Sequence, residues 1–131
     1  MEILFELGIS DNDIKNMLEQ CPDIMDMDYN EIRDKIDILR YIECNDRHIR
    51  NIIVSNPYYL DRINNDILKL IMYLKEIGIS CINLLFDSNP YLLNRDVFEI
   101  REYIDSRKNN GMDLEEIIDE FESNPYIIDE I

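Results

Sequence analysis

The chain has 131 residues, of which 46% are hydrophobic and 32% are charged, and its formal net charge at neutral pH is −16. This length is enough for a domain with its own hydrophobic core, and the composition is that of a globular chain and not of a disordered one. Because no apolar run approaches the roughly 20 residues of a transmembrane helix, and because MEILFELGIS resembles neither a signal peptide nor a transit peptide, we expect a cytoplasmic protein without a membrane segment.

The acidic charge is concentrated at both ends of the chain. Residues 1–30 carry eight acidic side chains against one basic side chain, and residues 99–131 carry eleven against three. Residues 31–98 carry ten against nine and are therefore close to neutral. Affinity for nucleic acid comes largely from Lys and Arg side chains that neutralise phosphates, so the charge of the whole chain disfavours a nucleic-acid partner.

A six-residue phrase divides the chain at regular intervals. It reads QCPDIM at 20–25, SNPYYL at 55–60, SNPYLL at 88–93 and SNPYII at 123–128. The four prolines in this phrase are 35, 33 and 35 residues apart. A second landmark lies twelve to fourteen residues before each proline and places four residues at equivalent positions: Gly8, Glu43, Gly78 and Gly111. A period in this range is typical of helical repeats.

Each unit contains two predicted helices. Before the glycine position, apolar residues recur at steps of three and four and form one face of a helix, as in Ile32, Ile36, Leu39 and Ile42. Glycine ends this helix because it tolerates a left-handed backbone. A polar side chain is expected to cap the second helix, namely Ser10, Asp46, Ser80 or Asp113. The second helix ends at Asn-Pro, because the residue before proline avoids the α region, and a 3₁₀ turn follows.

The units span approximately 1–28, 29–63, 64–95 and 96–131, and the first unit begins within its first helix. The chain thus holds about three and a half units, which bury their apolar faces by stacking on one another. No linker rich in Gly or Ser interrupts them. We therefore predict an all-α fold, a helical-repeat solenoid that forms one domain over residues 1–131.

This arrangement resembles the mTERF repeat of the mitochondrial transcription termination factor family. The resemblance lies in LFELGIS…CPDIM, LKEIGIS…NPYLL and NNGMDLEEIIDEFESNPYII, and it extends over essentially the whole chain. It implies a curved superhelix of α-helices and 3₁₀ turns, and nucleic-acid binding along a basic groove as in the organellar members. This chain is shorter than those members, lacks a transit peptide and has the opposite charge, so the resemblance bears on the fold more than on the function.

A local basic cluster occurs in RYIECNDRHIR, at residues 40–50, and contains Arg40, Arg47, His48 and Arg50. As a nucleic-acid site, these side chains would contact phosphates from the end of one helix and along the next. The alternative is a solvated face whose arginines pair with neighbouring acidic residues. We favour this alternative, because a few arginines within so negative a chain are a weak electrostatic footprint. His48 is the only histidine, and we expect it on a helix surface.

The segment DLEEIIDEFE, at residues 113–122, stacks carboxylates at i,i+4 spacing and thereby brings together Glu115, Glu116, Asp119 and Glu120. We interpret this set as a solvated face, with the docking of a basic partner as the alternative.

The segment DMDYNE, at 26–31, imitates the start of a calcium loop but lacks the required glycine, so Asp28 or Asn30 is expected to cap a helix instead. The three cysteines have no zinc-ligand spacing, and the sequence predicts neither a metal nor a cofactor.

Three functions remain open at this point. The leading hypothesis is a non-enzymatic interaction module that binds a protein partner through its curved or acidic surfaces, since helical repeats form extended binding surfaces. The alternatives are mTERF-like nucleic-acid binding through the central arginines, and an acidic nucleic-acid mimic that blocks a DNA- or RNA-binding protein. An enzyme is the least favoured class, because no catalytic motif is present. The end units lack obvious polar caps, so a homodimer through a terminal repeat is a further prediction.

Overall fold

The computed structural model describes residues 1–130, except the side chain of Glu130, and these residues contain α-helices and 3₁₀ helices but no strand. The α-helices are α1 (Glu2–Glu6), α2 (Asp11–Gln20), α3 (Tyr29–Tyr41), α4 (Asp46–Ser55), α5 (Asn64–Glu76), α6 (Ile82–Ser88), α7 (Val97–Asn109) and α8 (Leu114–Ser123). The 3₁₀ helices are η1 (Pro22–Asp26), η2 (Pro57–Asp61), η3 (Pro90–Asn94) and η4 (Ile127–Glu130). The prediction of an all-α helical-repeat fold is confirmed.

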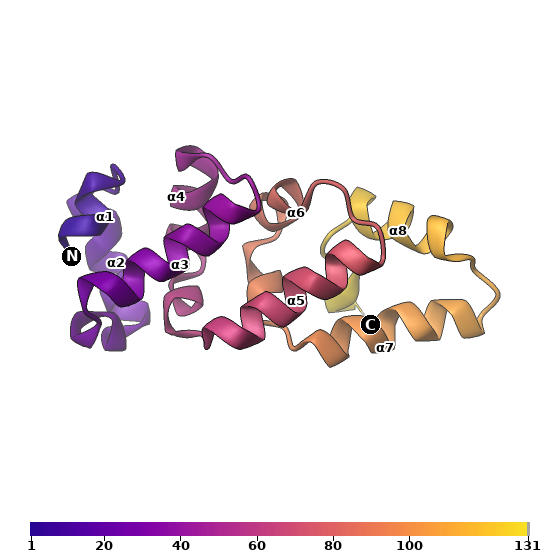
Figure 1. The fold of residues 1–131 in the computed structure, drawn as a ribbon. Helices are drawn as coiled ribbons and strands as arrows, with labels where there is room; N and C mark the ends of the chain where they lie inside the picture. Colours follow the sequence, from indigo (N-terminus) through magenta and orange to yellow (C-terminus); the bar gives the residue numbers. More distant parts are fainter. Residues whose placement is uncertain (131) are drawn as a thin grey trace.

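The units follow one another along an elongated molecule, from the indigo N-terminal end to the yellow C-terminal unit (Figure 1). Equivalent elements of successive units pack side by side. First helices meet in the pairs α1 with α3 and α5 with α7, second helices in the series α2, α4 and α6, and turns in the series η1, η2 and η3. Their buried hydrophobic side chains form one continuous core from Ile3 to Ile128. The expected single domain and its unit boundaries stay predictions.

The first helix of each unit ends at a residue with a left-handed backbone. The φ angles are +93° at Gly8, +70° at Glu43, +100° at Gly78 and +94° at Gly111. The following residue donates its backbone N–H to a carbonyl five residues earlier, as Cys44 does to Leu39 at 3.0 Å, which is the Schellman pattern of a helix end. The four positions that the sequence aligned are therefore equivalent, and Glu43 adopts the glycine conformation.

The second helices begin as predicted in two units and differently in two others. Ser10 and Asp113 cap α2 and α8, but Asn45, not Asp46, caps α4. The helix α6 begins after Cys81 without a side-chain cap, so the prediction of a cap by Ser80 is wrong as well. In both cases the residue at the N-cap position, Asn45 or Cys81, lies one residue from the predicted one. Asp28 caps α3 as predicted, by accepting the N–H of Glu31 at 2.8 Å.

The repeated Asn-Pro phrase connects the second unit to the third and the third to the fourth. Asn56 is 1% exposed, and its Nδ2 donates to the Pro90 carbonyl at 3.1 Å and to Asn94 Oδ1 at 3.0 Å. Asn94 Nδ2 donates back to Asn56 Oδ1 at 3.0 Å. Asn89 is fully buried and donates to the Pro125 carbonyl at 3.0 Å. Buried amides need such partners, so the asparagine ends its own helix and also fixes the position of the following unit.

None of the helices in the described part of the chain combines the length and the apolar character that a bilayer crossing requires.

Candidate docking groove

The central basic cluster is largely engaged in contacts within the protein. Arg40 Nη1 pairs with Asp46 Oδ1 at 3.0 Å. Arg50 Nη1 donates to the carbonyl of Leu7 in the first unit at 3.1 Å. Within the described residues, Arg47 is exposed and forms no ion pair. Of the residues in this cluster, Arg47 is therefore the arginine most available to a ligand. The role of the cluster in nucleic-acid binding stays a prediction.

The expectation that His48 lies on a helix surface is wrong. Its side chain is 7% exposed, and its Nδ1 accepts the backbone N–H of Asn45 at 3.2 Å. The Asn45 side chain in turn accepts the backbone N–H of His48 at 2.8 Å. This reciprocal arrangement is a capping box, which satisfies N–H groups that the first turn of α4 leaves unpaired.

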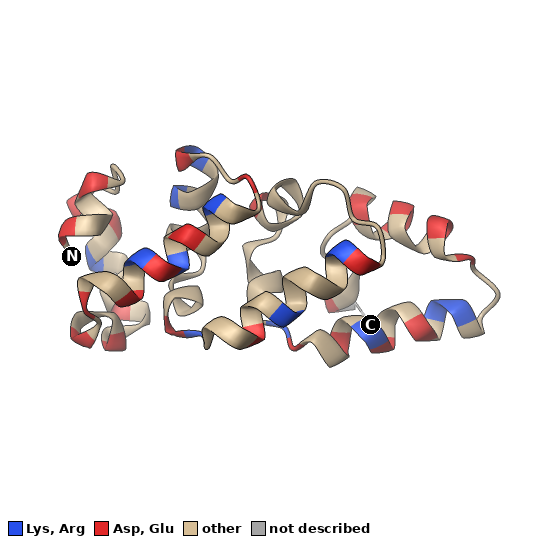
Figure 2. Ribbon diagram, viewed as in Figure 1, with Lys and Arg blue, Asp and Glu red and all other residues tan. Residues whose placement is uncertain are grey.

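The predicted acidic face on α8 is mostly exposed, but one of its members has a structural role. Glu115, Glu116 and Asp119 face solvent, and repulsion from Asp113 raises the pKa of Glu116. Glu120 is half-buried, and its Oε1 accepts hydrogen bonds from the Tyr103 hydroxyl at 2.7 Å and from Arg107 Nε at 2.9 Å. All charged residues of α8 are acidic, as Figure 2 shows. Docking of a basic partner to this face stays a prediction.

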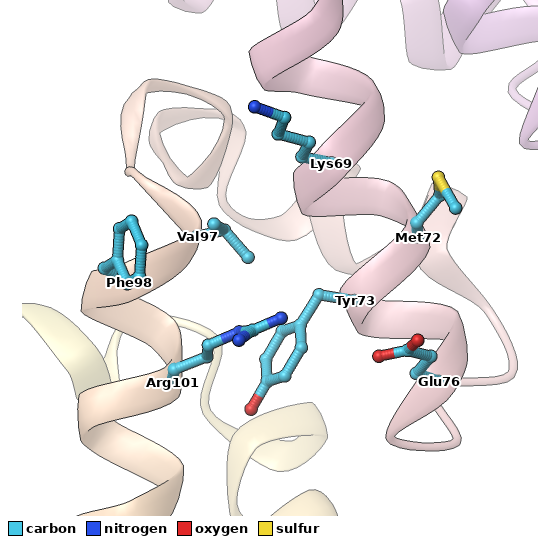
Figure 3. A pocket seen from close by; sticks show the side chains of 7 residues that line it. All are labelled: Lys69, Met72, Tyr73, Glu76, Val97, Phe98 and Arg101. Atoms are coloured by element: carbon cyan, nitrogen blue, oxygen red, sulfur yellow. The ribbon is translucent and has the colours of Figure 1, made fainter.

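A groove that sequence reasoning missed lies between α5 and α7, the first helices of the third and fourth units. Its volume is about 320 Å³. Side chains from both helices line it, as Figure 3 shows: Lys69, Met72, Tyr73, Glu76, Val97, Phe98 and Arg101. Both helices turn their main apolar stripe to the core, so the groove residues belong to a second face of each helix.

Large apolar side chains are unusually exposed along this groove. Met72 is 64% exposed and Phe98 is 68% exposed. Ile63, just before α5, and Leu68, within it, are exposed as well, although neither lines the groove. Leu68 and Met72 are four residues apart and therefore share one side of the helix. Single exposed apolar residues are normal, but several on neighbouring elements mark an interaction surface.

Two basic side chains extend into the space between the helices. Lys69 extends from α5 toward α7, and Arg101 extends from α7 toward α5, as Figure 3 shows. The Arg101 guanidinium lies over the Tyr73 ring, 4.9 Å from its centroid. Burial raises the pKa of Tyr73, so its hydroxyl is neutral at physiological pH. Within the described part of the chain, neither Lys69 nor Arg101 forms an ion pair.

The groove offers apolar contact and positive charge, which suit the binding of a ligand. Within the described residues, no group of three or more His, Cys, Asp or Glu side chains is placed to hold a metal ion. The sequence did carry a signal for the groove. Leu68 and Met72 lie outside the core stripe of Ile67, Leu70 and Ile71, and an apolar pair outside the stripe predicts a second contact surface.

Comparison with known proteins identifies the family of the fold. The mTERF family model matches residues 1–86, which is well over half of the chain and includes α1 to α5 and most of α6. The α7 wall of the groove lies outside this match. No curated protein and no solved structure shows significant similarity to the chain. The extent of the family match, together with the repeated units of two helices and a 3₁₀ turn, shows that the chain belongs to the mTERF family.

Proposed function

We propose that this mTERF-family protein is a non-enzymatic helical-repeat module that binds a protein partner in the groove between α5 and α7. The observation that supports the proposal is the combination of Met72 and Phe98, both more than half exposed, with two basic side chains that have no ion-pair partner among the described residues. Aromatic residues and arginine are enriched at the energetic centres of protein interfaces, where Met is common as well.

The expected affinity is moderate. Complete burial of a Met or Phe side chain contributes about 1.5–3 kcal/mol. Association also loses translational and rotational freedom, so only part of this energy appears as affinity. We therefore expect a dissociation constant of about 1 μM, which corresponds to a binding free energy of roughly −8 kcal/mol.

Matched substitutions test this proposal. Met72→Asp and Phe98→Asp place a charge in the groove, whereas Met25→Asp changes a methionine of the same exposure, 65%, in η1. Proteins that co-purify from the natural cells would be compared among the variants by quantitative mass spectrometry, after circular dichroism has shown equal helix content. We expect one partner to be retained by the native protein and by Met25→Asp but lost by both groove variants. Equal recovery with all four proteins would refute the proposal.

A second candidate is nucleic-acid binding, which is typical of the mTERF family. The observation that favours it is the placement of Lys69, Lys75 and Arg101 on α5 and α7 without ion pairs among the described residues. Three phosphate contacts would give a slope of about −2.7 in a plot of log affinity against log salt concentration for duplex DNA.

Titration of a labelled random pool of DNA and RNA, from low to moderate salt, tests this second function. Binding that weakens steeply with salt supports it, and absence of binding even at low salt contradicts it. The double variants Lys69→Glu/Arg101→Glu and Arg40→Glu/Arg47→Glu then distinguish the groove from the central arginine cluster.

A further inference from the structure

The shape of the groove favours a helical ligand. Both walls are helices of 13 residues, which corresponds to a length of about 20 Å at 1.5 Å per residue. An amphipathic helix lies naturally in an apolar groove between two helices. An extended peptide would instead need a sheet edge with free N–H and C=O groups, and the described part of the chain contains no strand that could provide one.

The charges within the groove restrict the ligand further. The chain has 29 acidic and 13 basic residues, yet Lys69 and Arg101 extend into the groove without a carboxylate partner among the described residues. A ligand that covers these two cations removes them from water, which is strongly unfavourable unless the ligand supplies acceptors. Glu76 lies toward the other end of the α5 wall, seven residues or about 10.5 Å along the helix from Lys69. Arg101 contacts the Tyr73 ring, which lies between Lys69 and Glu76 along α5, so the two cations are spread along the groove and Glu76 is its one acidic lining residue among those described.

Nucleic acid fits this pattern less well than a peptide does. One or two carboxylates of a peptide are enough to pair with the two cations. A polynucleotide carries a phosphate on every nucleotide, so its other phosphates would lie outside the groove. Beyond the groove, α7 carries Glu99 and Glu102 as well as Arg107 and Lys108, and all the charged residues of α8 are acidic. A short helix with few charges avoids these residues.

We infer that the groove between α5 and α7 binds an amphipathic helix of a partner protein that presents carboxylates to Lys69 and Arg101. Apolar side chains of this helix, spaced three or four residues apart, contact Met72 and Phe98. This inference rests on the proposed function, because it specifies the chemistry of the protein partner at the same site.

The test uses the full chain and a display library of helical 18-residue peptides. The peptides carry a fixed apolar stripe and randomised positions beside it, and selection on the native protein is followed by counter-selection on Phe98→Asp. Enrichment of Asp or Glu beside the apolar stripe is the expected result. If the peptides that need Phe98 for binding are enriched in Lys or Arg, or show no enrichment of charged residues, the inference is overturned while the proposed function stands. If no selected peptide depends on Phe98, both are overturned.

Charge reversal provides the quantitative readout. We expect Lys69→Glu/Arg101→Glu to lower the affinity for a selected acidic peptide by at least about tenfold. The same double variant should bind more tightly to a version of that peptide in which Lys replaces the acidic residues. Lys15→Glu/Arg47→Glu is the matched control, since it changes the net charge equally at exposed positions outside the groove. Equal losses in both double variants would show that only long-range repulsion acts and would overturn the inference. Displacement of the peptide by a 20-nucleotide DNA or RNA would assign the groove to nucleic acid and overturn it as well.

Discussion

Substitution of the buried Asn56 by alanine tests whether the Asn-Pro phrase joins the units. The variant loses the hydrogen bond from Asn56 Nδ2 to the Pro90 carbonyl and the two reciprocal bonds with Asn94. Asn94 is exposed and can bond to water instead, but Asn56 lies in the interior, and its partner Pro90 is also buried. An acceptor left unsatisfied in the interior costs about 1–3 kcal/mol, and each lost net hydrogen bond costs about 0.5–1.5 kcal/mol. We therefore expect the free energy of unfolding to fall by about 2–4 kcal/mol.

Urea denaturation followed by circular dichroism measures this change, with Asn16→Ala as the control. Asn16 is exposed in the middle of α2, so its replacement should alter the free energy of unfolding by no more than about 0.5 kcal/mol. Asn89→Ala removes the equivalent bond to Pro125 at the next junction and should resemble Asn56→Ala. If Asn56→Ala were no more destabilising than Asn16→Ala, the bonds between the units would not contribute to stability and the reasoning would be refuted.

Three further measurements follow from the fold. Glu43→Gly should raise the free energy of unfolding by about 0.5–1 kcal/mol, because glycine adopts a φ of +70° without the steric cost of a side chain, while Gly78→Ala should lower it; the opposite order in urea denaturation would contradict this explanation. A thiol reagent at pH 8 should modify Cys81 rapidly and the other two cysteines only on unfolding, since Cys21 and Cys44 are buried and burial raises the pKa of Cys44 to about 12; rapid modification that persists in Cys81→Ser would count against it. The midpoint of thermal unfolding should rise between about 10 and 200 mM NaCl, because salt screens the repulsion within a chain of net charge −16; a falling midpoint would show that the ion pairs dominate.

The repeat could be predicted because its signals are local. A left-handed residue, a cap and a proline each act on their own few residues, so Gly8, Gly78 and Gly111 identify helix ends without knowledge of the fold. The error of one residue at the start of α4 has a local cause as well. Two adjacent polar residues, such as Asn45 and Asp46, can both cap a helix, and only the path of the backbone selects between them.

The groove and the contacts of the central arginine cluster could not be predicted in the same way. Adjacent residues in a helix point about 100° apart, so Arg47, His48 and Arg50 diverge although they are close in sequence. The contact of Arg50 with Leu7 depends on the rotation between the first and second units, which no local pattern specifies. The placement of Met72 and Phe98 on the two walls of one groove likewise depends on the rotation between the third and fourth units.

The bond from the asparagine before one proline to the carbonyl of the next proline also bears on how such a chain can evolve. The third unit carries both halves of the connection, since its Pro90 carbonyl accepts from the preceding unit and its Asn89 donates to the following one. An in-frame duplication of this unit therefore brings its own junction with it, and the array can lengthen without compensating mutations elsewhere. The first unit has Cys21 at the donor position, so a copy of that unit would lack the asparagine donor. Growth by duplication is thus favoured for the unit that contains Pro90 and Asn89.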